Sequence, residues 1–216
     1  MRRANILVGL ALVAGLCGSI ALARPMELNW DMLAPAPEPY DNPFADLSVD
    51  QMRDLRTVLK AQAAAGDNPA STLPEEAAAA RARLDEQGLD VEWLFQQREI
   101  IMEKRLAASV STVPEHVGQN VRIPGYLLPL EIQDGKATEF LLVPTVGACI
   151  HTPPPPPNQM VYVTYPQGVA VSGLYTPVWI NGTLEADLRT EQVTYSDGKS
   201  NVEVSYVMQA DLVEAY

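Results

Sequence analysis

Residues 121–143 read VRIPGYLLPLEIQDGKATEFLLV, and this stretch decides the fold of the second half of the chain. Val121 to Leu130 and Thr138 to Val143 are rich in aliphatic and β-branched residues, which is typical of strands. Between them, Asp134-Gly135 favours a hairpin turn, because both residues tolerate the positive φ angles that such turns need. The stretch therefore predicts an antiparallel hairpin.

Further short strand patterns follow this hairpin toward the C-terminus. They cover Met160 to Tyr165, Val178 to Ala186 and Val202 to Val213, and Asp197-Gly198 is a second hairpin signal. About five strands in roughly 100 residues is the count of a small barrel of the oligonucleotide/oligosaccharide-binding (OB) type, although a small sandwich satisfies the same pattern. We expect residues 111–216 to form an OB-like antiparallel β-barrel.

The residues before this β-rich part predict helices. Ser48 with Gln51 is a capping-box pattern, and Gly66 stands where the helix that follows would end. An alanine-rich run begins at Pro74, which is a good first helical residue, and Asp90 can cap a third helix. We therefore predict a helical segment over residues 46–110, and an α+β fold class for the whole chain.

Residues 24–45 contain five prolines and few β-branched residues. This composition predicts an extended, proline-rich leader. Leu28, Trp30 and Leu33 are the residues expected to hold it at intervals.

Residues 1–23 have the pattern of a secretory signal peptide. Arg2 and Arg3 precede an uncharged apolar run, and Ala21-Leu-Ala23 is a small-x-small cleavage pattern. A lipoprotein start at Cys17 is the weaker alternative, because Leu16 stands where a small residue is needed. No later apolar run is long enough to span a bilayer, so we expect a periplasmic protein without a membrane span.

The charge of the chain excludes one class of partner. The formal net charge is −12, and loss of Arg2 and Arg3 with the signal would make it −14. Nucleic acid and anionic membranes are polyanions that such a surface repels. We therefore expect no nucleic-acid partner.

The stretch GACIHTPPPPPNQ, residues 147–159, contains the chemistry of the predicted site. Once Cys17 is removed with the signal, Cys149 is the remaining cysteine, and it cannot form an internal disulfide. If the chain is extended here, Cys149 and His151 point to the same side. A five-proline run follows, predicted to be a stiff polyproline II rod because proline fixes φ and lacks an amide hydrogen.

Three interpretations of this pair compete. In the first, Cys149 and His151 bind Zn²⁺ together with His116, because thiolate and imidazole are preferred zinc ligands and two ligands are too few. In the second, the pair is a nucleophile and its base, although no oxyanion motif flanks it. In the third, Cys149 is a packed core residue and His151 bonds a free carbonyl of the proline run.

The sequence also resembles a known family. The resemblance rests on residues 28–33 (LNWDML), 116–131 (HVGQNVRIPGYLLPLE), 139–144 (EFLLVP) and 147–159. These segments are similar to those of DUF3299, a family of exported bacterial proteins without an assigned function. The resemblance implies a setting among zinc-repressed transport systems, with ABC-type envelope transport components as partners, and so favours the zinc interpretation.

The sequence thus predicts a periplasmic, non-enzymatic accessory protein that binds or handles a divalent metal, zinc above all. The alternative is a metal-free protein-binding or scaffold module that uses the proline rod and the barrel surface. The residues assigned to a binding surface are the following: Pro153, Pro154, Pro155, Pro156, Pro157, Asn158 and Gln159. A thiol enzyme is the third hypothesis.

Overall fold

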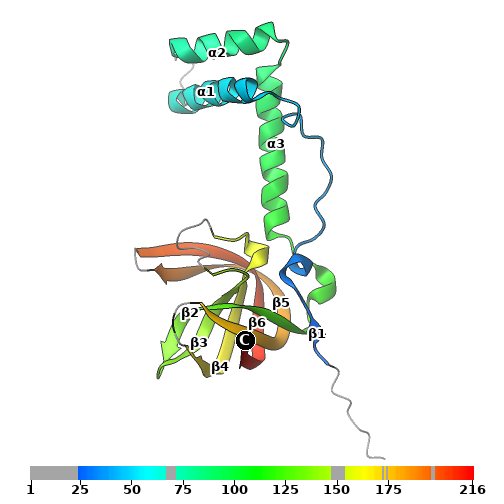
Figure 1. Ribbon diagram of the computed structural model, residues 1–216, viewed down its shortest axis with the longest axis vertical. Helices are drawn as coiled ribbons and strands as arrows, with labels where there is room; N and C mark the ends of the chain where they lie inside the picture. The colour runs from blue at the N-terminus through cyan, green and yellow to red at the C-terminus, as the bar shows by residue number, and fades with distance from the viewer. Residues whose placement is uncertain (1–23, 67–71, 147–153, 172, 174, 196–197) are drawn as a thin grey trace, which may run out of the picture.

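The structure is a computed structural model (Figure 1) that describes residues 24–66, 72–146, 154–171, 173, 175–195 and 198–216. These described residues form a mixed α+β fold with three α-helices and a six-stranded sheet. The helices are α1 (Val49–Ala65), α2 (Glu75–Glu86) and α3 (Val91–Val110). None of the described helices is long and apolar enough to cross a membrane.

Local sequence signals set the ends of the helices. The predicted capping box is present, with Gln51 N–H donating to the Ser48 hydroxyl and the Gln51 side chain accepting from Ser48 N–H. Gly66 ends α1 at a φ of 57°, and the Asp90 side chain caps α3. Pro74 is the residue before α2 and not its first helical residue, a shift of one position.

The three helices form an arm that projects from the sheet. In Figure 1, α1 and α2 lie side by side across the far end of α3, whose other end reaches the sheet. A small core joins them, and it includes Leu55 of α1, Leu84 of α2 and Leu94 of α3. An ion pair at 2.6 Å between Arg83 and Asp54 adds a contact between α2 and α1, and it lowers the pKa of the Asp54 carboxyl below its usual value.

The predicted hairpin of residues 121–143 is confirmed. Strands β2 (Asn120–Gln133) and β3 (Lys136–Val143) pair antiparallel, and Asp134 and Gly135 form the turn with φ angles of 50° and 77°. The other strands are β1 (Met26–Glu27), β4 (Val161–Ala170), β5 (Thr176–Tyr195) and β6 (Gly198–Ala215).

The sheet differs from the expected antiparallel arrangement at two pairings. β1 pairs parallel with β2, and β4 pairs parallel with β6, whereas the remaining pairs are antiparallel. β5 pairs with both β6 and β2, so the pairings run from β2 through β3, β4, β6 and β5 back to β2. β5 and β6 are also much longer than predicted and continue as a two-stranded extension beyond β2 and β4.

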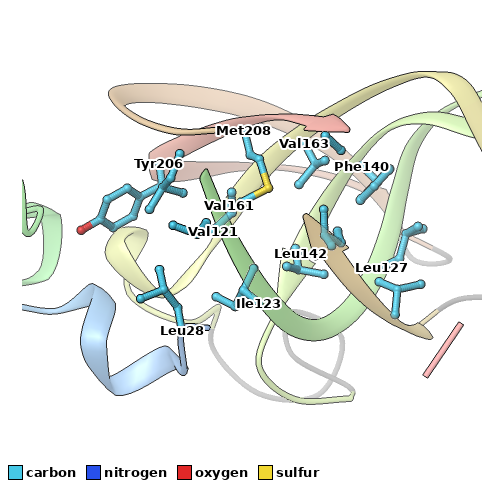
Figure 2. Packing of buried hydrophobic residues seen from close by; sticks show 14 of the residues in the cluster. Leu28, Val121, Ile123, Leu127, Phe140, Leu142, Val161, Val163, Tyr206 and Met208 are labelled. Atoms are coloured by element: carbon cyan, nitrogen blue, oxygen red, sulfur yellow. The ribbon is translucent and has the colours of Figure 1, made fainter. Parts of the chain in front are cut away.

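The main core lies inside this sheet (Figure 2) and includes residues from the leader. Leu28 and Leu33 are 2 % and 0 % exposed, so both residues anchor the leader as predicted. Trp30 packs against the same core, and its Nε1 donates to the Pro124 carbonyl at 2.8 Å. The leader is thus an ordered part of the β-rich fold.

Candidate functional site

The predicted site residues divide between described and undescribed parts of the chain. Cys149, His151 and Pro153 lie outside the described residues, and so does Asp197 of the second hairpin signal. His116, Pro154 to Pro157, Asn158 and Gln159 are described. The zinc set of Cys149, His151 and His116 therefore stays a prediction.

His116 is the last residue of a 3-10 turn, η2 (Pro114–His116), just before β2. Its ring is half-buried, and its Nδ1 atom is buried without a hydrogen-bond partner among the residues that the structure describes. Close by, Gly118 N–H donates to the Leu184 carbonyl of β5 at 2.7 Å. Across the described ranges, no group of three or more His, Cys, Asp or Glu side chains could hold a metal ion.

Asn158, which was predicted as part of a binding surface, is 2 % exposed. Its Nδ2 donates to the carbonyls of Ala108 and Ser111 at 2.8 and 2.9 Å. These carbonyls belong to the C-terminal end of α3, where an α-helix leaves acceptors without partners. Asn158 therefore attaches the arm to the β-rich part of the chain.

Gln159 makes a similar contact with the leader. Its Nε2 donates to the Trp30 carbonyl at 2.9 Å, within the 3-10 turn η1 (Trp30–Leu33). The Asn-Gln pair at the end of the proline run thus makes two internal contacts, one with α3 and one with the leader. Sequence reasoning missed this role because both partners are distant along the chain.

Tyr206 is a further residue that sequence reasoning missed. Its ring is fully buried in the main core (Figure 2). Its hydroxyl donates to the Leu33 carbonyl at 2.8 Å and accepts from Val113 N–H at 2.7 Å. Burial raises the pKa of this hydroxyl above its ordinary value. Tyr206 lies in a predicted strand, but no sequence signal set its hydroxyl apart from those of the other tyrosines.

The proline run borders a groove. Pro156 has polyproline II angles, with φ −55° and ψ 150°, but Pro157 begins a 3-10 turn, η3 (Pro157–Gln159), so the predicted rod ends at Pro156. A cavity of about 580 Å³ lies between Pro154 to Pro157 and the β5–β6 extension. Asn201, Val202 and Glu203 of β6 and Thr190 of β5 line its other side.

One edge of β6 runs beside this groove. β4 pairs with β6 only between Tyr206 and Gln209, whereas β5 pairs with β6 as far as Gly198. Among the described residues, the β6 edge from Gly198 to Ser205 that faces away from β5 therefore has no strand partner. Such an edge presents backbone N–H and C=O groups that can pair with another strand.

The base of the extension is held by a second core and by charged side chains. Val193 and Val204 are buried in this core with Tyr162 of β4. Arg189 stacks on the Tyr162 ring at 4.3 Å and pairs with Glu191 at 2.6 Å. The Tyr162 hydroxyl donates to a Glu139 carboxylate oxygen at 2.6 Å, and its pKa is raised, first by burial and then by this bond.

Comparison with known protein families assigns the chain to one of them. The family described as "protein of unknown function (DUF3299)" matches residues 30–215. The chain belongs to the DUF3299 family. The match covers the helical arm, strands β2 to β6 and the proline run of this DUF3299 protein, so the resemblance seen in the sequence is confirmed.

A solved structure is similar to this DUF3299 chain. It is the crystal structure of a DUF3299-family protein from Pseudomonas aeruginosa PAO1, with 30 % sequence identity over 90 % of this chain and 97 % of that chain, and a TM-score of 0.47. A search of curated proteins finds no match.

Proposed function

We propose that this DUF3299 protein is a non-enzymatic protein-docking module of the bacterial periplasm. It binds an extended segment of a partner protein in the groove between Pro154 to Pro157 and the free edge of β6. The observation that supports this most is the β6 edge from Gly198 to Ser205, which has no strand partner in the described part of the chain and lies beside a cavity of about 580 Å³.

The edge offers the main-chain part of the recognition. Along a strand that is paired on one side, alternate residues direct their N–H and C=O groups to the other side. An added strand gains affinity from these bonds, and specificity from the pockets that take its alternate side chains. The groove next to the edge provides the space for such a strand.

The proline run forms the opposite wall. Proline lacks an amide hydrogen, so its carbonyls can accept bonds but its nitrogen cannot donate them. Pro156 and Pro157 carbonyls accept from Gln159 and Met160, whereas no acceptor bond of Pro154 or Pro155 occurs within the described residues. This wall favours a partner segment that supplies donors.

Charge selects the side chains of that segment. Glu203 lines the groove and is exposed, and the whole chain carries −12. A segment that carries lysine or arginine is attracted to this surface, whereas an acidic one is repelled. ABC-type envelope transport components are the partner class that this proposal takes from the family resemblance.

An OB-like barrel is the finer description of the sheet that we propose. The circuit of pairings from β2 through β3, β4, β6 and β5 back to β2 supports it, since a small barrel requires each strand to have two neighbours. In this description the β5–β6 extension is an addition at one end of the barrel, where the groove lies.

Site-specific photo-crosslinking in cells tests the docking proposal. A photo-reactive residue in place of Asn201, in the groove, should crosslink to one envelope protein, and the same residue in place of Glu185, exposed on β5 outside the groove, should not. Glu203→Lys should abolish the crosslink, whereas the matched reversal Glu185→Lys should preserve it. Equal crosslinking from both positions, or none from Asn201, would refute the docking role.

Binding of a divalent metal is the second candidate function. It is favoured by His116, whose buried Nδ1 atom has no hydrogen-bond partner within the described residues, so this atom can act as a ligand there. His116 would bind Zn²⁺ with Cys149 and His151, and the bound ion would serve an accessory role in transport.

Metal analysis after equilibration with Zn²⁺ and desalting tests this second candidate. About one equivalent should be retained by the protein and lost in both Cys149→Ala and His116→Ala, as expected for a site that needs at least three ligands. Unchanged zinc retention in His116→Ala would show that His116 is not a ligand of the site. No retained zinc in the parent protein would refute metal binding.

A further inference from the structure

A cleft in the helical arm lies away from the proline groove. It has a volume of about 360 Å³ and is bounded by α1, α3 and leader residues near Phe44. Small-molecule sites in proteins fall between roughly 300 and 1,000 Å³. The cleft is therefore large enough for one small molecule.

The wall of the cleft is mostly apolar. The apolar side chains that line it include Phe44, Met52, Leu59, Phe95, Ile101 and Met102. Phe44, Met52 and Phe95 are only partly buried and pack against the arm's core, and Met102 is 49 % exposed. Apolar surface that remains accessible to water gains free energy when a ligand covers it.

Three arginines line the same cleft, namely Arg56 from α1 and Arg98 and Arg105 from α3. Arg98 pairs with Glu99. In the described part of the chain, Arg56 and Arg105 have no carboxylate within ion-pair distance. The cleft is thus an apolar site with uncompensated positive charge, on a chain whose net charge is −12.

Arg105 is held in place by a neutral group. Its Nε and Nη2 donate to the Tyr40 hydroxyl at 3.2 and 2.9 Å, and its guanidinium lies 5.9 Å from the centre of the Tyr40 ring. A phenol fixes the orientation of a guanidinium without neutralising it. Arg105 also lines a second cavity, of about 410 Å³, between α3 and leader residues 35–40, and the lining of that cavity includes Glu38 and Lys104.

We propose that this arm cleft binds a single-chain anionic amphiphile, with a long-chain fatty acid as its simplest form. The alkyl chain lies against the apolar wall, and the carboxylate binds at Arg56 and Arg105. A guanidinium and a carboxylate match in geometry and charge, whereas a neutral lipid has no charged group that could pair with the arginines. An acidic amphipathic peptide is the competing occupant, and the experiment below distinguishes it from a fatty acid.

Calorimetric titration of the purified protein with dodecanoate, kept below its micellar concentration, tests this site. We expect saturable binding of one molecule, with much weaker binding of dodecanol and none of dodecyltrimethylammonium. Arg56→Gln should weaken dodecanoate binding by at least about threefold, the lower range for an exposed charge pair. It should leave dodecanol binding unchanged, because the apolar wall is intact.

Arg53→Gln is the matched control. Arg53 lies on the same helix and pairs with Asp50 on an exposed surface outside the cleft, so its loss should not change dodecanoate binding. A second variant, Met102→Glu, places a carboxylate at an exposed position of the wall and should abolish binding of dodecanoate. Circular dichroism establishes that each variant keeps its helices.

Three results would overturn the proposal. The first is the absence of saturable dodecanoate binding, including a result in which only an acidic amphipathic peptide binds. The second is equal affinity for dodecanoate and dodecanol, because the arginines would then contribute nothing. The third is an equal effect of Arg56→Gln and Arg53→Gln, which would indicate only a general charge effect. None of these results bears on the β6 groove, so the two proposals fail separately.

Discussion

Tyr206 links three parts of the chain through one hydroxyl group. The ring fills the main core, while the hydroxyl satisfies the Leu33 carbonyl of the leader and the Val113 N–H that follows α3. A buried backbone group without a partner costs free energy comparable to a lost hydrogen bond. We therefore expect the loss of the Tyr206 hydroxyl oxygen to destabilise the protein more than the loss of any other single oxygen atom.

Tyr206→Phe should lower the free energy of unfolding by about 2 kcal/mol, because two backbone groups lose their partner while the ring volume is kept. Urea unfolding followed by circular dichroism measures the change. Tyr165→Phe is the matched control, since Tyr165 is partly buried against the same core and forms no hydrogen bond through its side chain among the described residues. A control effect as large as that of Tyr206→Phe would contradict the assigned role.

The buried hydroxyls of Tyr162 and Tyr206 should make the stability of the protein sensitive to alkali. The pKa values of Tyr162 and Tyr206 are raised in the folded state above the ordinary tyrosine value of about 10. The stability that they contribute is complete below that value and is lost as pH rises above it, because the unfolded chain releases the protons first. Urea unfolding should therefore show a steeper loss of stability above about pH 10 in the parent than in Tyr206→Phe. Parallel profiles would contradict this.

At the scale of elements, η3 is the joint between the arm and the sheet. Asn158 holds the last turn of α3, and Gln159 holds η1. The two side chains act on carbonyl groups that the helix and the leader leave free. The position of the arm thus depends on one dipeptide that follows the proline run.

Asn158→Ala should lower the free energy of unfolding by about 1–3 kcal/mol, because two carbonyl groups lose a buried donor. Hydrogen exchange should accelerate in the last turn of α3 and in the segment that follows it, where the freed carbonyls lie. Asn201→Ala, an exposed asparagine of β6, should change stability by less than about 0.5 kcal/mol. If exchange in α3 were unchanged, the capping role of Asn158 would be wrong.

Local signals explain which elements were predictable. The caps at Ser48 and Asp90 and the turn at Asp134-Gly135 depend on contacts within three residues, so the sequence near each of them is sufficient. The hairpin of residues 121–143 was predicted for the same reason. Element boundaries shifted by one or a few residues where, as at Pro74, no side chain fixes the end.

Long-range contacts explain what was missed. Asn158 reaches a carbonyl 50 residues away, and Gln159 one that is 129 residues away, so neither bond can be read from a local pattern. β5 was predicted to end at Ala186, too early, because the polar residues that follow, such as Arg189 and Glu191, do not look like a buried strand. The parallel pairing of β4 with β6 likewise depends on the whole topology.

At the scale of the whole molecule, the arm's core and the main core differ in size and stabilise different parts of the chain. The arm's core consists of a few residues of α1, α2 and α3, whereas the sheet encloses the larger main core. Regions with few buried apolar contacts open at lower free energy than the rest of a protein. The arm should therefore open without the sheet.

Leu84→Ala tests this division. Leu84 is fully buried in the arm's core, and its truncation should cost about 2–5 kcal/mol locally. Hydrogen exchange should accelerate strongly in α1 and α2 while protection in β2 to β6 is kept. Leu142→Ala, the same truncation in the main core, should reduce protection in the strands. Uniform loss of protection in both variants would show that arm and sheet unfold together.

The bond between Leu33 and Tyr206 also has a consequence for the time at which the protein can fold. The two residues are 173 positions apart, and outside the leader the main core is built from residues 121 onward. At a synthesis rate of about 5–20 residues per second, about 10–35 seconds pass between the synthesis of Leu33 and that of Tyr206. During that interval the helices can already close on one another, because their contacts are local. The leader, with Leu28, Trp30 and Leu33 uncovered, is then the part of the newborn chain that most needs protection from other chains.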